Sequence, residues 1–247
     1  MHTFKSRGLA QRIWRLVYPY IGHFWIIRSL LAARTEFLHR ARDPDTVRRY
    51  LATNPSPRLH LGCGPHQLPG WLNSDLIVFR ADNVRIDATK EFPLPTVSFD
   101  FVFTEHMVEH IPFDGALSAF SESFRILKPG GMIRVSTPDL SFLFSLLQHP
   151  IDDVRAEYLQ WSCETYLKTP LVNGAVVINN FVRNWGHSFI FDKATLEWAL
   201  RHAGFVNVIF FPVKQSATAA LCNLENTERL PKNFVALESI CAEAVKP

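Results

Sequence analysis

The sequence predicts an α/β fold in which helices cover both faces of a mostly parallel β-sheet. Short apolar runs alternate with segments of helical spacing along most of the chain, a pattern typical of βαβ units. Glycine or polar residues directly follow four of these runs, where the strands of such a sheet open onto a ligand. The length of 247 residues is sufficient for one sizeable domain with an appendage.

Seven runs are expected to be strands, because each is apolar and bounded by Pro, Gly, Asn or Ser. They are residues 58–61, 71–76, 83–86, 99–104, 132–136, 205–212 and 234–245. Two segments with apolar residues at helical spacing are expected to be helices, residues 113–128 and 193–203. Pro129-Gly130-Gly131 predicts a turn after the first helix, and Gly204 predicts a cap after the second.

The first expected strand ends in Gly62-Cys63-Gly64. Two glycines one residue apart allow a tight turn and a close approach of a ligand to the backbone, because no Cβ intervenes. Asp75 follows the second strand, where a carboxylate can accept hydrogen bonds from a ribose diol. The third and fourth strands are followed by Asp87-Ala88 and by Glu105-His106. These four strand ends predict a site for a nucleotide-like ligand.

The N-terminal residues differ from the rest in charge. Residues 1–49 carry ten basic and three acidic residues, a net charge of +7, whereas the remaining residues have a net charge of −4. We therefore expect residues 1–50 to form a basic, amphipathic helical appendage. Its uncharged window, residues 16–27, is shorter than the roughly 20 residues of a transmembrane helix. Two interpretations stay open: packing on the domain or in a dimer, and peripheral contact with a membrane through residues 1–40.

Composition excludes several classes of protein. The four cysteines are scattered, with no CxxC pair, which disfavours a zinc ribbon or a disulfide scaffold and fits a reducing, cytoplasmic compartment. The net negative charge after residue 49 disfavours nucleic acid as a partner. The expected location is the cytoplasm, with the inner face of the cytoplasmic membrane as the place of any peripheral contact.

The chain resembles class I S-adenosylmethionine-dependent methyltransferases from about residue 57 onward. The resemblance rests on the segments LHLGCG (59–64), SFDFVF (98–103) and RILKPGGMIRVSTPDL (125–140). A bacterial subgroup that often accompanies cell-surface polysaccharide biosynthesis is similar in LPGWLNSDL (68–76), EHMVEH (105–110) and NNFVRNWGHSFIFD (179–192). The resemblance implies a Rossmann-like domain over residues 51–247, closed by an antiparallel last strand.

The resemblance also implies roles for the residues at the strand ends. Those expected to bind S-adenosyl-L-methionine are Gly62, Cys63, Gly64, Asp75, Asp87, Ala88 and Glu105. Gly62 and Gly64 would lie under the methionine part, Asp75 would bind the ribose, and Asp87 would face the adenine. The sequence departs from the family pattern at Pro65, which replaces the usual third glycine, and leaves little room for a helix between the first two strands.

Methyl transfer to a hydroxyl benefits from a general base, for which histidine is suited near neutral pH. The candidates are His106, His110 and His187. If a helix begins at Glu105, His106, Glu109 and His110 share one face. These three residues are then also candidate ligands of a divalent metal ion, and packing at the helix start is a further interpretation. His187 is a candidate base, a third metal ligand or a loop contact.

Residues 141–186 form an insertion expected to build the acceptor site. Trp161, Tyr166, Phe181 and Trp185 are aromatic residues that either stack on an acceptor or form a small core, and Asn179, Asn180 and Arg183 are candidate polar contacts. The function expected from this resemblance is methyl transfer to a small molecule or a glycan, with oxygen as the expected methylated atom and a histidine base assisting the in-line displacement. The alternative is a cofactor-binding, non-catalytic partner of a membrane-associated glycan-assembly complex.

Overall fold

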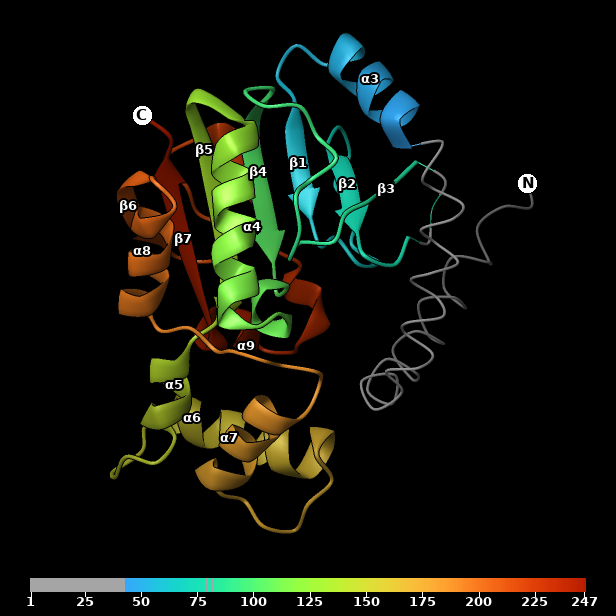
Figure 1. Ribbon diagram of the computed structural model, residues 1–247. Coiled ribbons are helices and arrows are strands. Elements are labelled where there is room, and N and C mark those ends of the chain that lie inside the picture. Colours follow the sequence, from blue (N-terminus) through green and yellow to red (C-terminus); the bar gives the residue numbers. More distant parts are fainter. Residues whose placement is uncertain (1–42, 79, 81) are drawn as a thin grey trace, which may run out of the picture.

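A computed structural model describes residues 43–78, 80 and 82–247, and it contains the expected seven-stranded, mostly parallel sheet (Figure 1). The strand order is β3-β2-β1-β4-β5-β7-β6, and β7 runs antiparallel to both of its neighbours. The strands are β1 (Arg58–Leu61), β2 (Leu72–Asp75), β3 (Val84–Arg85), β4 (Phe99–Glu105), β5 (Leu127–Pro138), β6 (Val206–Phe211) and β7 (Ser239–Val245). The predicted fold class is confirmed.

Two predicted elements differ from the structure. The Pro-Gly-Gly turn at residues 129–131 lies inside β5, whose pairing with β4 shifts register there between Phe99 and Phe101. Residues 234–238 were expected to begin the last strand, but they form the short helix α9 (Phe234–Glu238). Phe234 is almost fully buried against Tyr158 of the insertion, so tertiary packing overrides the strand preference of this apolar run.

Three helices contribute to the apolar core on one face of the sheet. They are α3 (Asp43–Thr53), α4 (Phe113–Ile126) and α8 (Lys193–His202), and α4 and α8 lie side by side in Figure 1. Among the described residues, the core of the opposite face comes from the turn after β1 and from residues 212–233, which include the short helices η3 (Ala219–Leu221) and η4 (Thr227–Arg229). Leu68, Trp71, Phe103, Leu221 and Leu224 form that second core.

The described part of the expected appendage belongs to α3. Val47 is buried in the main core, and the Asp43 carboxylate accepts a hydrogen bond of 2.8 Å from the Arg85 backbone N–H. The helix therefore continues across residue 50 and packs on the sheet. The expectations for residues 1–42 lie outside the described residues. No helix in the described ranges is long and apolar enough to cross a bilayer.

The insertion forms a separate helical layer beyond the carboxyl ends of β1 and β4 (Figure 1). It contains α5 (Leu140–Ser145), α6 (Asp153–Gln160), the π-helix η2 (Trp161–Tyr166) and α7 (Gly174–Arg183). These helices share a third apolar core with Phe234 of α9. The insertion is thus fixed at the edge of the sheet where the strand-end residues lie.

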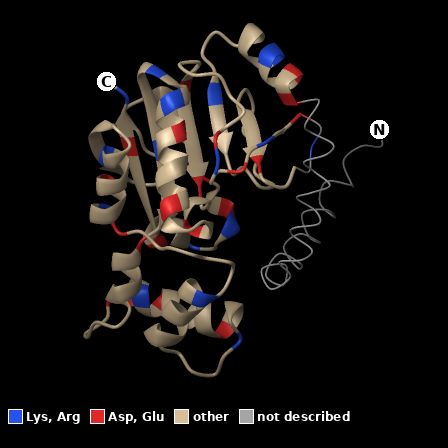
Figure 2. Ribbon diagram, in the orientation of Figure 1, with Lys and Arg blue, Asp and Glu red and all other residues tan. Residues whose placement is uncertain are grey.

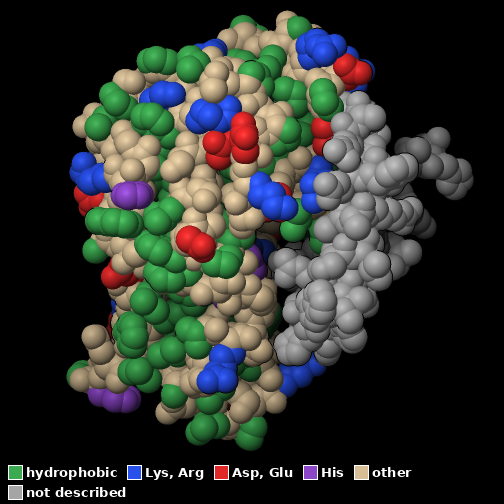
Figure 3. Space-filling view, in the orientation of Figure 1, with side chains coloured by type: hydrophobic (Ala, Val, Ile, Leu, Met, Phe, Trp, Pro, Cys, Tyr) green, Lys and Arg blue, Asp and Glu red, His purple; other side chains and the backbone are tan. Residues whose placement is uncertain are grey.

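Charged side chains are distributed over both layers (Figure 2). On the face seen in Figure 3, basic and acidic side chains alternate with apolar ones. A surface that tracks phosphates carries a continuous basic stripe instead. The face that bears α4 and α8 therefore lacks the charge pattern of a surface that binds nucleic-acid phosphates.

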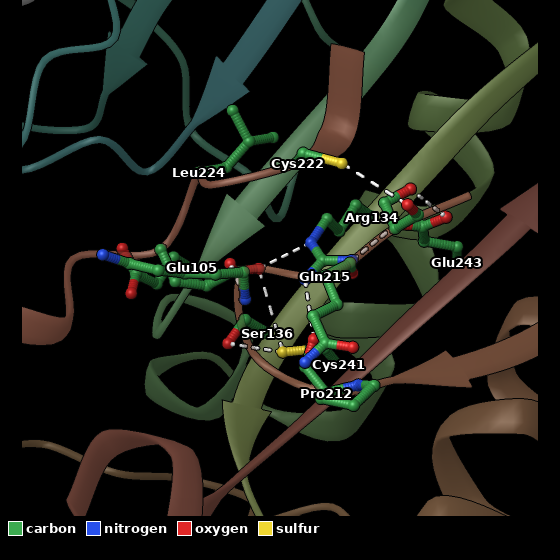
Figure 4. Close-up of polar contacts among 12 residues, drawn as sticks. Glu105, Arg134, Ser136, Pro212, Gln215, Cys222, Leu224, Cys241 and Glu243 are labelled. Atoms are coloured by element: carbon green, nitrogen blue, oxygen red, sulfur yellow. Dashed lines mark hydrogen bonds and ion pairs between the residues drawn. The ribbon is translucent and has the colours of Figure 1, made fainter. Parts of the chain in front are cut away.

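Arg134, in the centre of β5, attaches residues 212–233 to the sheet (Figure 4). Its guanidinium is fully buried and lies 2.5 Å from both the Glu225 and Glu243 carboxylates. It also donates a hydrogen bond of 2.9 Å to the Gln215 carbonyl. A buried charge needs such partners, so this cluster sets the path of the chain between β6 and β7.

Candidate functional site

The two glycines after β1 adopt left-handed backbone conformations. The φ angles are +71° at Gly62 and +49° at Gly64, which only glycine adopts readily. A Cβ on Gly62 would lie 2.2 Å from Cγ of Met107, whereas a Cβ on Gly64 would have no atom within 4 Å. Gly62 therefore allows the chain after β4 to pack on the turn, and Gly64 leaves its backbone open to a ligand.

Asp75, at the end of β2, holds the glycine turn in place. Its Oδ2 accepts a hydrogen bond of 2.8 Å from the Gly64 N–H, and its Oδ1 accepts one of 3.0 Å from the Ile77 N–H. Each carboxylate oxygen has two lone pairs, so a carboxylate can accept more than two hydrogen bonds in total. Among the described residues, no helix follows the turn before β2, as the short spacing predicted.

Cys63, between the two glycines, is a structural residue. Its side chain is buried, and burial raises the pKa of the thiol to about 12. The sulfur receives hydrogen bonds from the side-chain amides of Gln67 and Asn83, at 3.3 and 3.5 Å. A thiol with so high a pKa is a poor nucleophile, which leaves Cys63 with a packing role beside the turn.

Asp87 and Ala88 follow β3. Asp87 Oδ1 accepts hydrogen bonds from the Thr89 N–H and hydroxyl, and its Oδ2 lies 3.2 Å from Lys90 Nζ. Burial raises the pKa of Asp87, but these hydrogen bonds outweigh it and lower the pKa. Ala88 is buried in the main core. Asp87 is ionised at neutral pH and caps its own turn.

The donor set around the turn fits S-adenosylmethionine. Gly64 offers a backbone that a Cβ would obstruct, and Asp75 beside it is the acidic group that a ribose requires. Glu105, at the end of β4, receives hydrogen bonds of 2.9 and 3.1 Å from the Asn226 N–H. Its carboxylate therefore links the end of β4 to residues 212–233, which also contact the chain after the glycine turn, where His66 Nε2 lies 3.1 Å from the Leu224 carbonyl.

His106 is held by partners on both ring nitrogens. Nδ1 lies 3.1 Å from Glu109 Oε1, and Nε2 contacts Ser239 Oγ at 3.0 Å and the Arg229 guanidinium. Burial lowers the pKa of the imidazole, and the Arg229 charge lowers it further, to about 4. At neutral pH His106 is uncharged, and its lone pair is turned toward Arg229 rather than toward a substrate.

Glu109 is fully buried in the 3-10 helix η1 (Val108–His110). Its Oε2 accepts a hydrogen bond of 3.1 Å from the Thr137 hydroxyl, whereas no hydrogen bond of acceptable angle reaches Oε1. Burial raises the pKa of Glu109, but His106, His110 and His187 outweigh it and bring the pKa to about 2. Because His106 is neutral above pH 4, its contact with Glu109 at pH 7 joins a neutral ring to a carboxylate.

His110 and His187 come from segments far apart in the sequence. The backbone N–H groups of Ser188 and Phe189 donate to the Glu109 carbonyl at 2.7 and 3.2 Å, which fixes the second segment against η1. The two imidazole rings consequently meet edge to face, with centroids 4.8 Å apart. His187 Nδ1 lies 2.7 Å from the Phe181 carbonyl. That contact assigns the proton to Nδ1 and leaves the Nε2 lone pair available.

The ligand-type atoms that converge are those of Glu109, His110 and His187, which lie within 4.8 Å of one another. The expected common helical face of His106, Glu109 and His110 is absent. β4 continues to Glu105, and His106 has a positive φ of 47°, so no α-helix begins there. His187, which the sequence analysis named as a possible third ligand, lies beside Glu109 and His110 in the position that helical spacing had predicted for His106.

The aromatic residues of the insertion pack mainly on one another. Trp161, Tyr166, Phe181 and Trp185 form a chain of ring contacts with centroids 5.0 to 5.7 Å apart. Trp185 also contacts His187, at 5.5 Å. Asn179, Asn180 and Arg183 line a groove of about 520 Å³ along α7. The insertion therefore has a small aromatic core and, next to it, an open groove lined by both polar and apolar side chains.

Sequence patterns did not identify several residues that surround the histidines. They are Thr137, Arg229, Glu238 and Ser239, all beyond the fourth strand. Asn226, whose backbone N–H donates to Glu105, was not identified either. Glu238 accepts a hydrogen bond of 2.7 Å from the Tyr158 hydroxyl, and burial raises its pKa to about 7. One signal was present: a charged residue, Arg134, in the middle of an apolar strand requires buried acidic partners. Those partners are Glu225, within residues 212–233, and Glu243, in β7.

The solved structures that match the chain do so at low sequence identity and with TM-scores below 0.5. Phosphoethanolamine N-methyltransferase 2 of Haemonchus contortus, in complex with S-adenosyl-L-methionine, is 15% identical, with a TM-score of 0.44 over 84% of this chain and 52% of that one. This chain thus spans about half of that enzyme. A possible histamine N-methyltransferase of Thermotoga maritima is 15% identical, with a TM-score of 0.46 over 95% of this chain and 100% of that one. A SAM-dependent methyltransferase of Archaeoglobus fulgidus is 17% identical, with a TM-score of 0.44 over 89% and 94% of the two chains.

The amino-acid sequence shows to which family the chain belongs. No curated protein matches the chain. The model of the methyltransferase domain family matches residues 34–209, from before α3 into β6. This range includes the glycine turn, Asp75, the histidine cluster and the insertion, and it is well over half of the 247 residues. The chain therefore belongs to the methyltransferase domain family.

Proposed function

We propose that the protein transfers a methyl group from S-adenosyl-L-methionine to a hydroxyl group of a small molecule or a glycan. Membership of the methyltransferase domain family supports the reaction type. The observation that carries the proposal is the open left-handed turn at Gly64, held by the Asp75 carboxylate. The family match favours catalysis over the role of a non-catalytic partner.

The residues proposed to hold the cofactor are those of the glycine turn and the following strand ends. Backbone groups of Gly62, Cys63 and Gly64 face the methionine part, Asp75 accepts from the ribose, and Asp87 and Ala88 border the adenine. When bound, the cofactor supplies a methyl group already activated by a positive sulfonium. The contribution of this chain is then alignment of the acceptor, which is worth up to about 7–11 kcal/mol in favourable reactions.

We propose that His110 and His187 activate the acceptor hydroxyl. Burial lowers the pKa of His187, so its ring is neutral at pH 7. Its Nε2, which carries the lone pair, can then accept the proton of the acceptor hydroxyl. His106 has a different part in the proposal, because its nitrogens are engaged by Glu109, Ser239 and Arg229. It orients Glu109 and does not touch the acceptor. A base at this position adds roughly 10²–10⁴-fold to the rate.

The acceptor is proposed to enter along α7. The groove there is lined by apolar side chains and by the polar side chains of residues such as Asn179 and Arg183. The backbone carbonyl of Asn184, another lining residue, accepts a hydrogen bond of 3.2 Å from the His187 N–H. Tyr166 and Trp185 offer aromatic edges between the groove and His187. Polar groups next to aromatic rings suit a sugar, and a cell-surface polysaccharide precursor is the proposed class of acceptor.

Peripheral membrane contact is a further part of the proposal. Exposed large apolar side chains gather in the insertion, at Phe144, Leu147, Val154, Tyr166, Leu171, Val172 and Val182. Together with the basic residues 1–40, they would place the acceptor groove near the cytoplasmic face of a membrane that carries lipid-linked sugars. Flotation with anionic liposomes tests this, and equal flotation of the chain without residues 1–40 would remove the contribution of that segment.

The experiment is a measurement of S-adenosylhomocysteine release with a panel of sugar and small-molecule hydroxyl acceptors. His187→Ala and His110→Ala are expected to lower turnover by about 10²–10⁴-fold and to leave cofactor affinity, measured by calorimetry, unchanged. His149→Ala, an exposed histidine of the same insertion, is the matched control. Cofactor binding without release over the whole panel, or full turnover in both variants, would contradict the proposal.

A further inference from the structure

We propose that Glu109, His110 and His187 bind one divalent transition-metal ion. Two imidazoles and one carboxylate, each offering one atom, are brought within 4.8 Å of one another from two segments of the chain. These ligand types suit Zn²⁺, Mn²⁺, Fe²⁺ and Co²⁺. Binding of the ion does not depend on the proposed methyl transfer. The role of the ion in activating the acceptor does rest on that proposed function.

The distances are close to those of a bound site. Metal–nitrogen and metal–oxygen bonds of about 2.0–2.2 Å place two ligands of one ion no more than about 4 Å apart. Two of these atoms at the 4.8 Å limit must therefore approach each other by at least roughly 1 Å, and a closer pair by less. The His110 and His187 rings are only partly buried, so rotation about their side-chain bonds can supply this change.

The ligands are oriented by outer partners, as in metal sites generally. The Phe181 carbonyl accepts from His187 Nδ1 at 2.7 Å, which directs Nε2 away from that carbonyl. The Thr137 hydroxyl donates to Glu109 Oε2 at 3.1 Å, and His106 Nδ1 lies 3.1 Å from Oε1. The backbone bonds from residues 188 and 189 to the Glu109 carbonyl hold the two segments together.

The carboxylate supplies an independent argument. Glu109 is fully buried, yet its Oε1 has no hydrogen bond of acceptable angle among the described residues. A buried carboxylate is unfavourable unless charge and hydrogen bonds compensate it. The groups that interact with Glu109 are the side chains of His106, His110, His187 and Thr137 and the carboxylate of Glu238, and none of them carries a permanent positive charge. A cation bound between Glu109 and the two histidines compensates the buried charge.

Three protein ligands leave coordination positions open for an acceptor hydroxyl. Coordination lowers the pKa of that hydroxyl, and its proton leaves to solvent water. The oxygen then attacks the methyl carbon as the carbon–sulfur bond breaks, with the electron pair passing to sulfur. The products are the methylated acceptor, S-adenosylhomocysteine and one proton, so charge and atoms balance. The ion thus takes the place of a histidine base in the proposed function.

The test is metal binding by the full chain in the absence of cofactor and acceptor. After chelator treatment, the protein is titrated with Co²⁺, followed by visible absorption, and with Zn²⁺ and Mn²⁺, followed by calorimetry. We expect one ion per chain, at least tenfold weaker binding in His110→Ala and in His187→Ala, and unchanged binding in His149→Ala. Circular dichroism verifies that each variant is folded. His106→Gln is expected to weaken binding by about 10–100-fold, as removal of an outer partner does.

Two outcomes would overturn the metal site: no stoichiometric binding of any of these ions, or binding that is the same in His110→Ala and His187→Ala as in the unmodified chain. Either result leaves the proposed methyl transfer standing, with a histidine as the base. Conversely, a chain that binds one ion and releases no S-adenosylhomocysteine with any acceptor contradicts the proposed function while the metal site stands. The two proposals therefore fail separately.

Discussion

The two glycines of the turn after β1 should respond differently to the same substitution. In Gly62→Ala, the left-handed φ of +71° costs about 1–2 kcal/mol. The new Cβ would also lie 2.2 Å from Met107 Cγ and 2.7 Å from Met107 Cβ, and forced overpacking of this kind costs about 1–3 kcal/mol. The free energy of unfolding should fall by about 2–5 kcal/mol.

Gly64→Ala is the matched variant. Its φ of +49° carries a similar backbone cost of about 1–2 kcal/mol, but no atom lies within 4 Å of the added Cβ. Its unfolding free energy should fall by that amount alone. The Cβ projects into the space assigned to the cofactor, so affinity for S-adenosylmethionine should fall at least tenfold.

Urea unfolding and calorimetry with S-adenosylmethionine measure the two effects. Met107→Ala in the Gly62→Ala background removes the nearest clashing atom and should recover part of the lost stability, whereas the same change should recover none in the Gly64→Ala background. Equal stabilities of the two single variants would refute the packing argument. Wild-type cofactor affinity of a folded Gly64→Ala protein would refute the assignment of the pocket.

Two further predictions concern buried ionisable groups. Arg134→Leu leaves Glu225 and Glu243 buried without their cation, so the free energy of unfolding measured in urea should fall by about 3–5 kcal/mol. The control, Arg48→Leu, breaks an exposed pair with Asp45 and should change this free energy by less than about 1 kcal/mol. Burial lowers the pKa of His60 to about 3 from 6.5, so the unfolded chain binds the extra proton between these values. Stability should therefore fall as pH decreases from about 6.5 toward 3, by up to about 1.4 kcal/mol per pH unit. His60→Gln should remove the contribution of one proton, up to about 1.4 kcal/mol per pH unit, from the slope of unfolding free energy against pH. An unchanged slope would show that His60 does not titrate in this range.

Local patterns predicted the elements that depend on local chemistry. The strand ends at Gly62, Asp75 and Glu105 were recognisable because a parallel sheet places glycine and polar residues there. The helix from Phe113 ends two residues before the predicted end. Where the prediction of the last strand was wrong, the first residues of an apolar run are bent into α9 by packing of Phe234 on the insertion, which no local pattern encodes.

The arrangement of the histidines depended on contacts between distant segments. Helical spacing grouped His106 with His110, but β4 extends to Glu105 and the positive φ of His106 turns its ring toward Ser239. His187 reaches His110 because the residues after it pair with the Glu109 backbone. Sequence could name these side chains as candidates, but their grouping is a property of the fold.

The position of β7 has a consequence for how the chain folds during synthesis. β5 and β6 are not neighbours; β7, which follows both in the sequence, lies between them and pairs with each. Until residue 245 has left the ribosome, β6 has no partner strand in the sheet, and one side of β5 remains an open edge. Open edges promote pairing between chains. A nascent chain stalled before residue 239 should thus depend on chaperones, whereas the seven residues of β7 cover the open edge of β5 and give β6 its partner strand at once.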